Sequence, residues 1–186
     1  MRRARDPELI GVVARRTIAV ALLVALIAAP AALARRGSAR QTKLQTLNLG
    51  VLVQLNAIRK AHHLRPLKLN SSLSAAAQGH SSEMLADGYF AHESVDGSPF
   101  WKRLNAYSSA APHGAWSVGE NLLWSSPEVD AVKALELWMA SPEHRHNILT
   151  ARWREIGIAA VHVDSAPGTY GGGAVTVITT DFGVRG

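Results

Sequence analysis

The chain has 186 residues, 47% of them hydrophobic, with 20 Lys and Arg against 14 Asp and Glu, which gives a formal net charge of +6. This length suits one domain preceded by a leader. The sequence contains no cysteine, which excludes disulfides, thiolate metal sites and a lipid-modified N-terminal cysteine. A domain of this size must therefore depend on its hydrophobic core for stability.

Residues 1–34 have the pattern of a signal peptide. An arginine-rich start leads into the apolar run Thr17 to Ala29, and Ala32 and Ala34 supply the small-x-small pattern that signal peptidase reads. This run is shorter than the roughly 20 residues that a stable membrane span needs. We therefore expect general secretion, with an uncleaved anchor ending near Ala34 as the alternative.

The basic character of the chain belongs partly to this leader. Cleavage after Ala34 removes five arginines and two acidic residues, so the net charge falls by three, from +6 to +3. The remaining Lys and Arg residues are scattered and form no stripe interleaved with aromatic residues. This pattern argues against a nucleic-acid partner. Contact with a membrane is expected only through an uncleaved leader.

Residues 35–43 are polar and predict a short tether, after which residues 44–186 form one domain. Apolar residues from Leu44 recur at spacings of three and four, which predicts a helix that ends before Pro66. Asn70 or Ser71 is expected to cap a second helix. On the inward face of that helix lies His80, which we expect to be a hydrogen-bonded core residue. A loop and a brief helix from Pro99 to Leu104 follow.

In the second half, Ser126 and Pro127 predict the start of a long helix, and "SPE" at residues 141–143 predicts the start of a short one. Two runs rich in β-branched residues, 155–163 and 174–184, predict a hairpin, and residues 116–124 add a third strand. Helices that precede a short antiparallel sheet indicate an α+β layered domain.

Three polar residues stand in constrained settings. His92 follows two aromatic residues in a loop, and Glu120 lies in an apolar stretch, where an unpaired acid is costly. His144 falls in the first turn of the short helix, whose dipole disfavours the imidazolium form. His146 lies roughly 200° further round the helix, so the two neighbouring histidines cannot face one site. Each residue also has a purely structural interpretation, as an exposed, backbone-bonded or capping side chain.

Six blocks in this order resemble the CAP superfamily, also called the SCP-like extracellular domain, and its bacterial branch most closely. The blocks are "LNAIRKAHHLRPLKLNSSLSAAAQGHSSEM", "YFAHESVDGSPFWKRL", "VGENL", "WMASPEHRHNIL", "REIGIA" and "TTDFG", between Asn48 and Gly183. The resemblance implies a three-layer α-β-α sandwich with a small central antiparallel sheet. It also implies a cleft lined by two histidines and acidic residues that can hold a divalent cation, often zinc.

The resemblance assigns cleft positions residue by residue. His92 and His144 match the two cleft histidines and are the candidate metal ligands, and Glu120 matches the acid of the G-E-N block. Asn147 stands where animal members place a glutamine. The second acid of animal members would fall in "WMAS", which ends at Ser141 and contains no acid. We therefore expect Glu120, Asn147 and Ser141 to support the cleft, and any zinc or other divalent-cation site to be open.

Three functions are compatible with these residues. The preferred one is a secreted or cell-envelope binding module for a lipid, glycan or protein, because the acid set is incomplete and no nucleophile is evident. The second is a metal-assisted hydrolase, a protease or cell-wall enzyme, with Glu120 as general base. The third is a structural envelope protein with a vestigial cleft. The sequence thus leans away from an enzyme, although the fold alone does not decide the function.

Overall fold

The computed structural model describes residues 9–109 and 115–186, with side chains from residue 33 onward. The chain divides into two compact units, Met1–Lys43 and Leu44–Gly186. Nearly all of the predicted leader lies outside the residues whose side chains are described, so its cleavage stays a prediction. Among the described residues, no helix is both long enough and apolar enough to cross a membrane.

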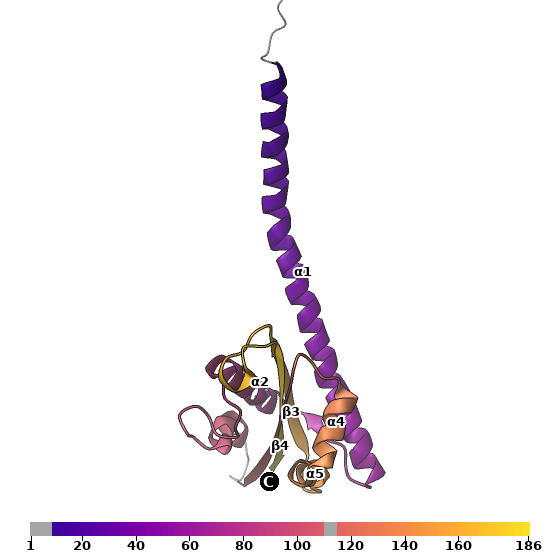
Figure 1. Cartoon of the computed structure of the whole chain (residues 1–186). Helices are drawn as coiled ribbons and strands as arrows, with labels where there is room; N and C mark the ends of the chain where they lie inside the picture. The colour runs from indigo at the N-terminus through magenta and orange to yellow at the C-terminus, as the bar shows by residue number, and fades with distance from the viewer. Residues whose placement is uncertain (1–8, 110–114) are drawn as a thin grey trace, which may run out of the picture. The chain divides into compact units, whose positions relative to one another are not determined.

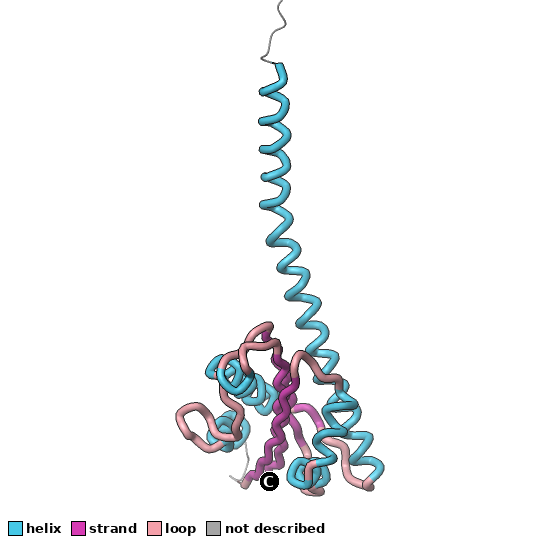
Figure 2. The backbone as a smooth tube through the Cα atoms, viewed as in Figure 1, coloured by secondary structure: helices cyan, strands magenta, loops and turns pink. Residues whose placement is uncertain are grey.

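A four-stranded sheet lies at the centre of the second unit (Figures 1 and 2). Its strands are β1 (Lys68–Leu69), β2 (Trp116–Ser125), β3 (Glu155–Val163) and β4 (Val175–Arg185), in the order β1-β3-β4-β2. The three long strands pair antiparallel, as predicted, whereas β1 runs parallel to β3. The sheet is therefore mixed, because the segment that leaves the first helix runs along the edge of β3 before the chain enters the next helix.

Helices cover both faces of this sheet, as the α-β-α sandwich requires (Figure 1). One face packs against the C-terminal part of α1 (Leu9–Ala61) and against α4 (Ala131–Ala140) and α5 (Pro142–Leu149). The other face packs against α2 (Ser71–Asp87). The remaining short elements are η1 (Phe100–Leu104), α3 (Asn105–Ser108) and η2 (Gly168–Tyr170). Residues 35–43, predicted as a tether, are helical and belong to α1.

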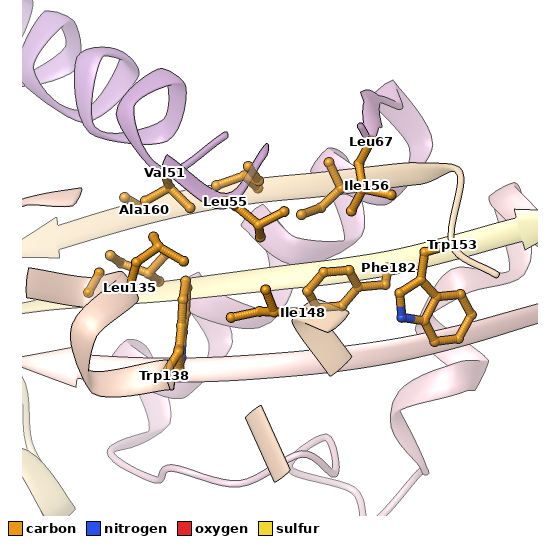
Figure 3. Packing of buried hydrophobic residues seen from close by; sticks show 13 residues of the cluster. Val51, Leu55, Leu67, Leu135, Trp138, Ile148, Trp153, Ile156, Ala160 and Phe182 are labelled. Atoms are coloured by element: carbon orange, nitrogen blue, oxygen red, sulfur yellow. The ribbon is translucent and has the colours of Figure 1, made fainter. Parts of the chain in front are cut away.

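The core follows the two-residue alternation of the strands, because successive side chains point to opposite faces of a sheet. On β4, Ile178 and Phe182 join the cluster under α1, α4 and α5, whereas Val175 and Val177 join the cluster under α2. Figure 3 shows the first cluster, which includes Val51, Leu55, Leu67, Leu135, Trp138, Ile148, Trp153, Ile156, Ala160 and Phe182.

Helix starts were predicted with unequal success. Asn70 caps α2, since its Oδ1 accepts a hydrogen bond from the backbone N–H of Leu73 at 3.1 Å. Pro142 opens α5, as predicted. The prediction for α4 was wrong, because the helix begins after Asp130 and not at Pro127. Strand β2 continues to residue 125, and the Asp130 carboxylate then accepts from the backbone N–H at position 133 at 2.8 Å.

The buried guanidinium of Arg59 joins the ends of two helices. Its Nη1 donates to the carbonyl oxygens of Ile148 at 2.7 Å and Thr150 at 3.0 Å, and its Nε donates to that of Arg65 at 2.9 Å. These acceptors lie at or just beyond the C-terminal turns of α5 and α1, where helix dipoles favour a cation. Arg59 therefore fixes α5, the helix that carries His144, against α1.

Candidate functional site

Glu120 lies at the centre of the candidate site. It lies on β2 and is 5% exposed. Successive residues of a strand point to opposite faces of the sheet, and Glu120 is on the face that packs against α2. Its Oε1 accepts from Nδ1 of His92 at 2.7 Å, and its Oε2 accepts from Nη2 of Arg103 at 2.6 Å. The sequence argument that an acid in this stretch needs a partner is therefore confirmed, and both carboxylate oxygens are occupied.

His92 is positioned by the loop that follows α2. Nη1 of Arg103 donates to the His92 carbonyl oxygen at 2.8 Å and to Oγ of Ser94 at 3.2 Å. One residue earlier, the Ala91 carbonyl accepts from Nε2 of His80 at 2.9 Å. His80 is 1% exposed, which confirms it as a satisfied core histidine.

The His92 ring has a defined orientation and protonation pattern. A carboxylate can only accept, so Nδ1 of His92 carries the proton that it shares with Glu120, and Nε2 is the free acceptor of the neutral ring. The hydrogen bond to Glu120 raises the pKa of His92 above its ordinary value, against the opposing effect of partial burial. Its side chain is 49% exposed, so the ring is accessible to a ligand.

His144 approaches the same site from α5. Partial burial lowers its pKa below the ordinary histidine value, and the nearby His92 lowers it further. The sequence predicted a neutral ring from the helix dipole, but desolvation is the main cause. The His92 ring thus lies close enough to His144 to lower its pKa, although 51 residues separate them in the chain.

Asn147 connects α5 to β2. Its Nδ2 donates to the Glu120 carbonyl oxygen and to Oδ1 of Asn121, both at 2.9 Å. Nδ2 of Asn121 in turn donates to the His144 carbonyl oxygen at 3.1 Å. The Ser141 hydroxyl bonds to the carboxylate of a neighbouring residue, Glu143, at 3.2 Å. Asn147 therefore holds the backbone of the site, whereas a contribution of Ser141 to ligand binding stays a prediction.

The two neighbouring histidines of α5 face different surroundings, as their angular separation predicted. His146 is exposed and lines a separate hollow together with Thr150, Arg152 and Trp153. His144 does not line this hollow. Only His144 is therefore assigned to the site with His92.

Sequence reasoning missed two charged residues of the site, Arg103 and Asp181. Asp181 is 2% exposed and lies directly opposite Glu120 in the β2–β4 register. Its Oδ1 has no hydrogen-bond partner among the described residues. Burial raises the pKa of Asp181 well above its usual range, and the negative charge of Glu120 raises it further. Asp181 could have been found from the sequence, because an acid within an apolar run is costly unless it is paired. The same argument identified Glu120.

These residues do not fit a tight metal centre. A catalytic zinc site has three protein ligands, but among the described residues no group of three or more His, Cys, Asp or Glu side chains could hold a metal ion. His92 and His144 supply two imidazoles. Glu120 bonds His92 and Arg103, so its negative charge is already compensated within the protein.

The fold and the site together define a class of protein: an α-β-α sandwich with a half-exposed histidine bonded to a buried carboxylate and a second histidine nearby. The sequence matches the profile of the CAP family, described as the cysteine-rich secretory protein family, over residues 52–179. This match covers more than half of the chain, so the protein belongs to the CAP family, although it contains no cysteine.

Relatives in Bacillus subtilis share this region. The chain is 34% identical over 113 residues to YkwD, named an uncharacterized protein, with 59% of this chain and 40% of the relative covered. It is 28% identical over 120 residues to YlbC, named an uncharacterized membrane protein, with 62% and 32% covered. The chain thus matches less than half of the length of either curated relative.

Two solved structures are similar in fold. An extracellular protein containing an SCP domain from Bacillus anthracis is 26% identical, with a TM-score of 0.56 over 78% of this chain and 43% of that one. An outer surface protein from Borrelia burgdorferi is 16% identical, with a TM-score of 0.57 over 73% and 90%. The second likeness shows the fold alone.

Proposed function

We propose that this protein is a CAP-domain binding module of the extracytoplasmic space, and that the groove at His92 and His144 binds a glycan, lipid or protein of the cell envelope. The predicted leader supports this location, as do the two solved structures of similar fold, which are an extracellular protein and an outer surface protein. One observation carries the proposal for the groove: Glu120 is fully engaged by His92 and Arg103, while the His92 ring remains half-exposed.

The chemistry of the groove favours a ligand that both donates and accepts hydrogen bonds. The Glu120 carboxylate orients the His92 ring and raises its pKa, which favours the charged form with Nε2 as a donor. The lowered pKa of His144 keeps the second ring uncharged near neutral pH, with one donor and one acceptor nitrogen. Phe100 adds an apolar surface, with its ring centroid 6.5 Å from that of His92. Sugar hydroxyl groups both donate and accept, and the apolar face of a sugar suits an aromatic ring, so a glycan is the first ligand to test.

The test is a binding screen of the full chain against cell-wall glycans, lipid vesicles and envelope proteins. His92→Ala and His144→Ala should each lose binding about tenfold or more, as expected when a hydrogen bond in a binding groove is removed. His146→Ala is the matched control, because His146 lies on the same helix but lines another hollow. Equal losses in all three variants, or binding unchanged in His92→Ala and His144→Ala, would rule out this groove. Absence of any ligand would favour the structural interpretation with a vestigial cleft.

The hydrogen bond between His92 and Glu120 also supports a second candidate, a hydrolase. A histidine oriented by a carboxylate is a general base, so His92 and not Glu120 would take the proton from an attacking water. The sequence-based hydrolase hypothesis gave that role to Glu120. Turnover of a peptide or cell-wall substrate that disappears in both His92→Ala and Glu120→Gln would support this candidate. Ligand binding without turnover in the wild-type chain would reject it.

A further inference from the structure

Arg103 bonds Glu120, the carboxylate that also accepts from His92. Arg103 comes from η1, and its side chain is 14% exposed, against 1% for the side chain of Glu120. The 2.6 Å contact between Nη2 and Oε2 is a short, charge-assisted hydrogen bond. The guanidinium also holds the loop at the His92 carbonyl oxygen and at the Ser94 hydroxyl. One cation thus bonds both the acid and the loop that carries the first histidine.

A divalent cation bound by Glu120 would have to compete with this guanidinium for the same carboxylate charge. A partly buried ion pair that loses one partner leaves an uncompensated charge in a poorly solvated place, which is strongly unfavourable. The neighbouring acid, Asp181, does not supply a second negative charge to attract the metal, because its environment favours the neutral form. One carboxylate charge therefore faces one guanidinium charge, and the local charges are balanced within the protein.

We propose that Arg103 takes the place of a metal ion in this groove: its guanidinium is a permanent cation that binds Glu120, orients His92 through it, and makes ligand binding independent of divalent cations. The proposal concerns the role of Arg103 and does not depend on which ligand the groove binds. It predicts that the wild-type groove is a poor zinc site and that removal of the guanidinium creates a better one.

The experiment is a titration of the full chain with Zn²⁺ alone, followed by isothermal calorimetry and by the NMR signals of the histidine rings. Wild-type protein should bind Zn²⁺ weakly at the two imidazoles, and Glu120→Gln should weaken that affinity by no more than about a hundredfold, because Glu120 acts on the metal only by orienting His92. Arg103→Gln should raise the affinity about tenfold or more, because it removes a positive charge beside the site and leaves the negative charge of Glu120 uncompensated. The double variant Arg103→Gln with Glu120→Gln should lose this gain. Lys102→Gln, which removes an exposed positive charge at the adjacent position, is the control and should show no gain.

Two results would overturn the proposal. The first is tight zinc binding by the wild-type chain that Glu120→Gln weakens much more than about a hundredfold, since a loss beyond that of a residue that only orients a ligand would make Glu120 a metal ligand despite Arg103. The second is a folded Arg103→Gln variant with unchanged zinc affinity. Circular dichroism establishes whether that variant folds, and if it does not, the comparison of wild type with Glu120→Gln still decides. These zinc titrations contain no glycan, lipid or envelope protein. A failed glycan screen therefore does not affect their results.

Discussion

Asp181→Asn should stabilise the fold at neutral pH, although it removes a charged residue type from the centre of the domain. Burial and the charge of Glu120 raise the folded-state pKa of Asp181 well above its ordinary value of 3.8. Folding therefore requires this carboxyl to hold a proton that it releases in the unfolded chain. Asparagine has nearly the same shape, is always neutral, and can donate to Glu120 through its amide.

The magnitude follows from proton linkage. Where the pH lies between 3.8 and the raised folded-state pKa, the folded state binds one more proton than the unfolded state, so wild-type stability falls by about 1.4 kcal/mol per pH unit. The variant lacks this loss. Its advantage should be absent near pH 4, should grow with that slope as the pH rises, and should level off at the folded-state pKa of Asp181.

Urea unfolding of both proteins, followed by tryptophan fluorescence at half-unit steps from about pH 4 to 8, measures this difference. Asp87→Asn serves as the matched control, because it removes one acidic charge from an exposed position at the end of α2. Parallel stability curves for wild type and Asp181→Asn across the whole range would refute the reasoning, since Asp181 would then titrate alike in both states.

The two site histidines should have opposite effects on acid stability: the raised pKa of His92 stabilises the fold below about pH 6.5 and is lost at higher pH, while the lowered pKa of His144 destabilises it as the pH falls. Thermal melts at about pH 5 and 8 should therefore show His92→Gln relatively less stable, and His144→Gln relatively more stable, at the lower pH. Equal shifts at the two pH values would contradict this assignment. Gly157→Ala should cost about 3 kcal/mol or more in urea unfolding, because a Cβ there would overlap the backbone of Leu73 on α2; a cost under about 1 kcal/mol would show that α2 can shift freely. Asn147→Ala should cost about 1–3 kcal/mol, because it removes the bonds between α5 and β2, and an unchanged melting temperature would show that those bonds contribute nothing.

Much of the fold was predictable because local signals and tertiary packing agree. The Ser-Pro-Glu start of α5, the Asn70 cap of α2 and the β-branched runs of β3 and β4 all appear where expected. The α4 start was mispredicted because Ser126-Pro127 and Asp130 both have the residue types of a helix start, and only the sheet pairing of β2 shows that the chain is still leaving a strand at residue 125.

The candidate site was predictable only in part. The family resemblance named His92, Glu120 and His144, and the apolar context of Glu120 independently required a partner. The sequence did not identify Arg103 as that partner, because no periodicity or spacing around Arg103 relates it to Glu120. Their contact arises when η1 packs beside β2, and such a tertiary contact has no local sequence signature.

The carbonyl oxygens around Arg59 make the helix that carries His144 difficult to move. Sliding or tilting α5 would pull Ile148 and Thr150 away from a guanidinium that has no access to water as a substitute. The backbone that carries His144 is therefore held in one position by buried contacts. A ligand of the proposed site should bind without a slow rearrangement of α5, and related ligands should differ mainly in how long they remain bound.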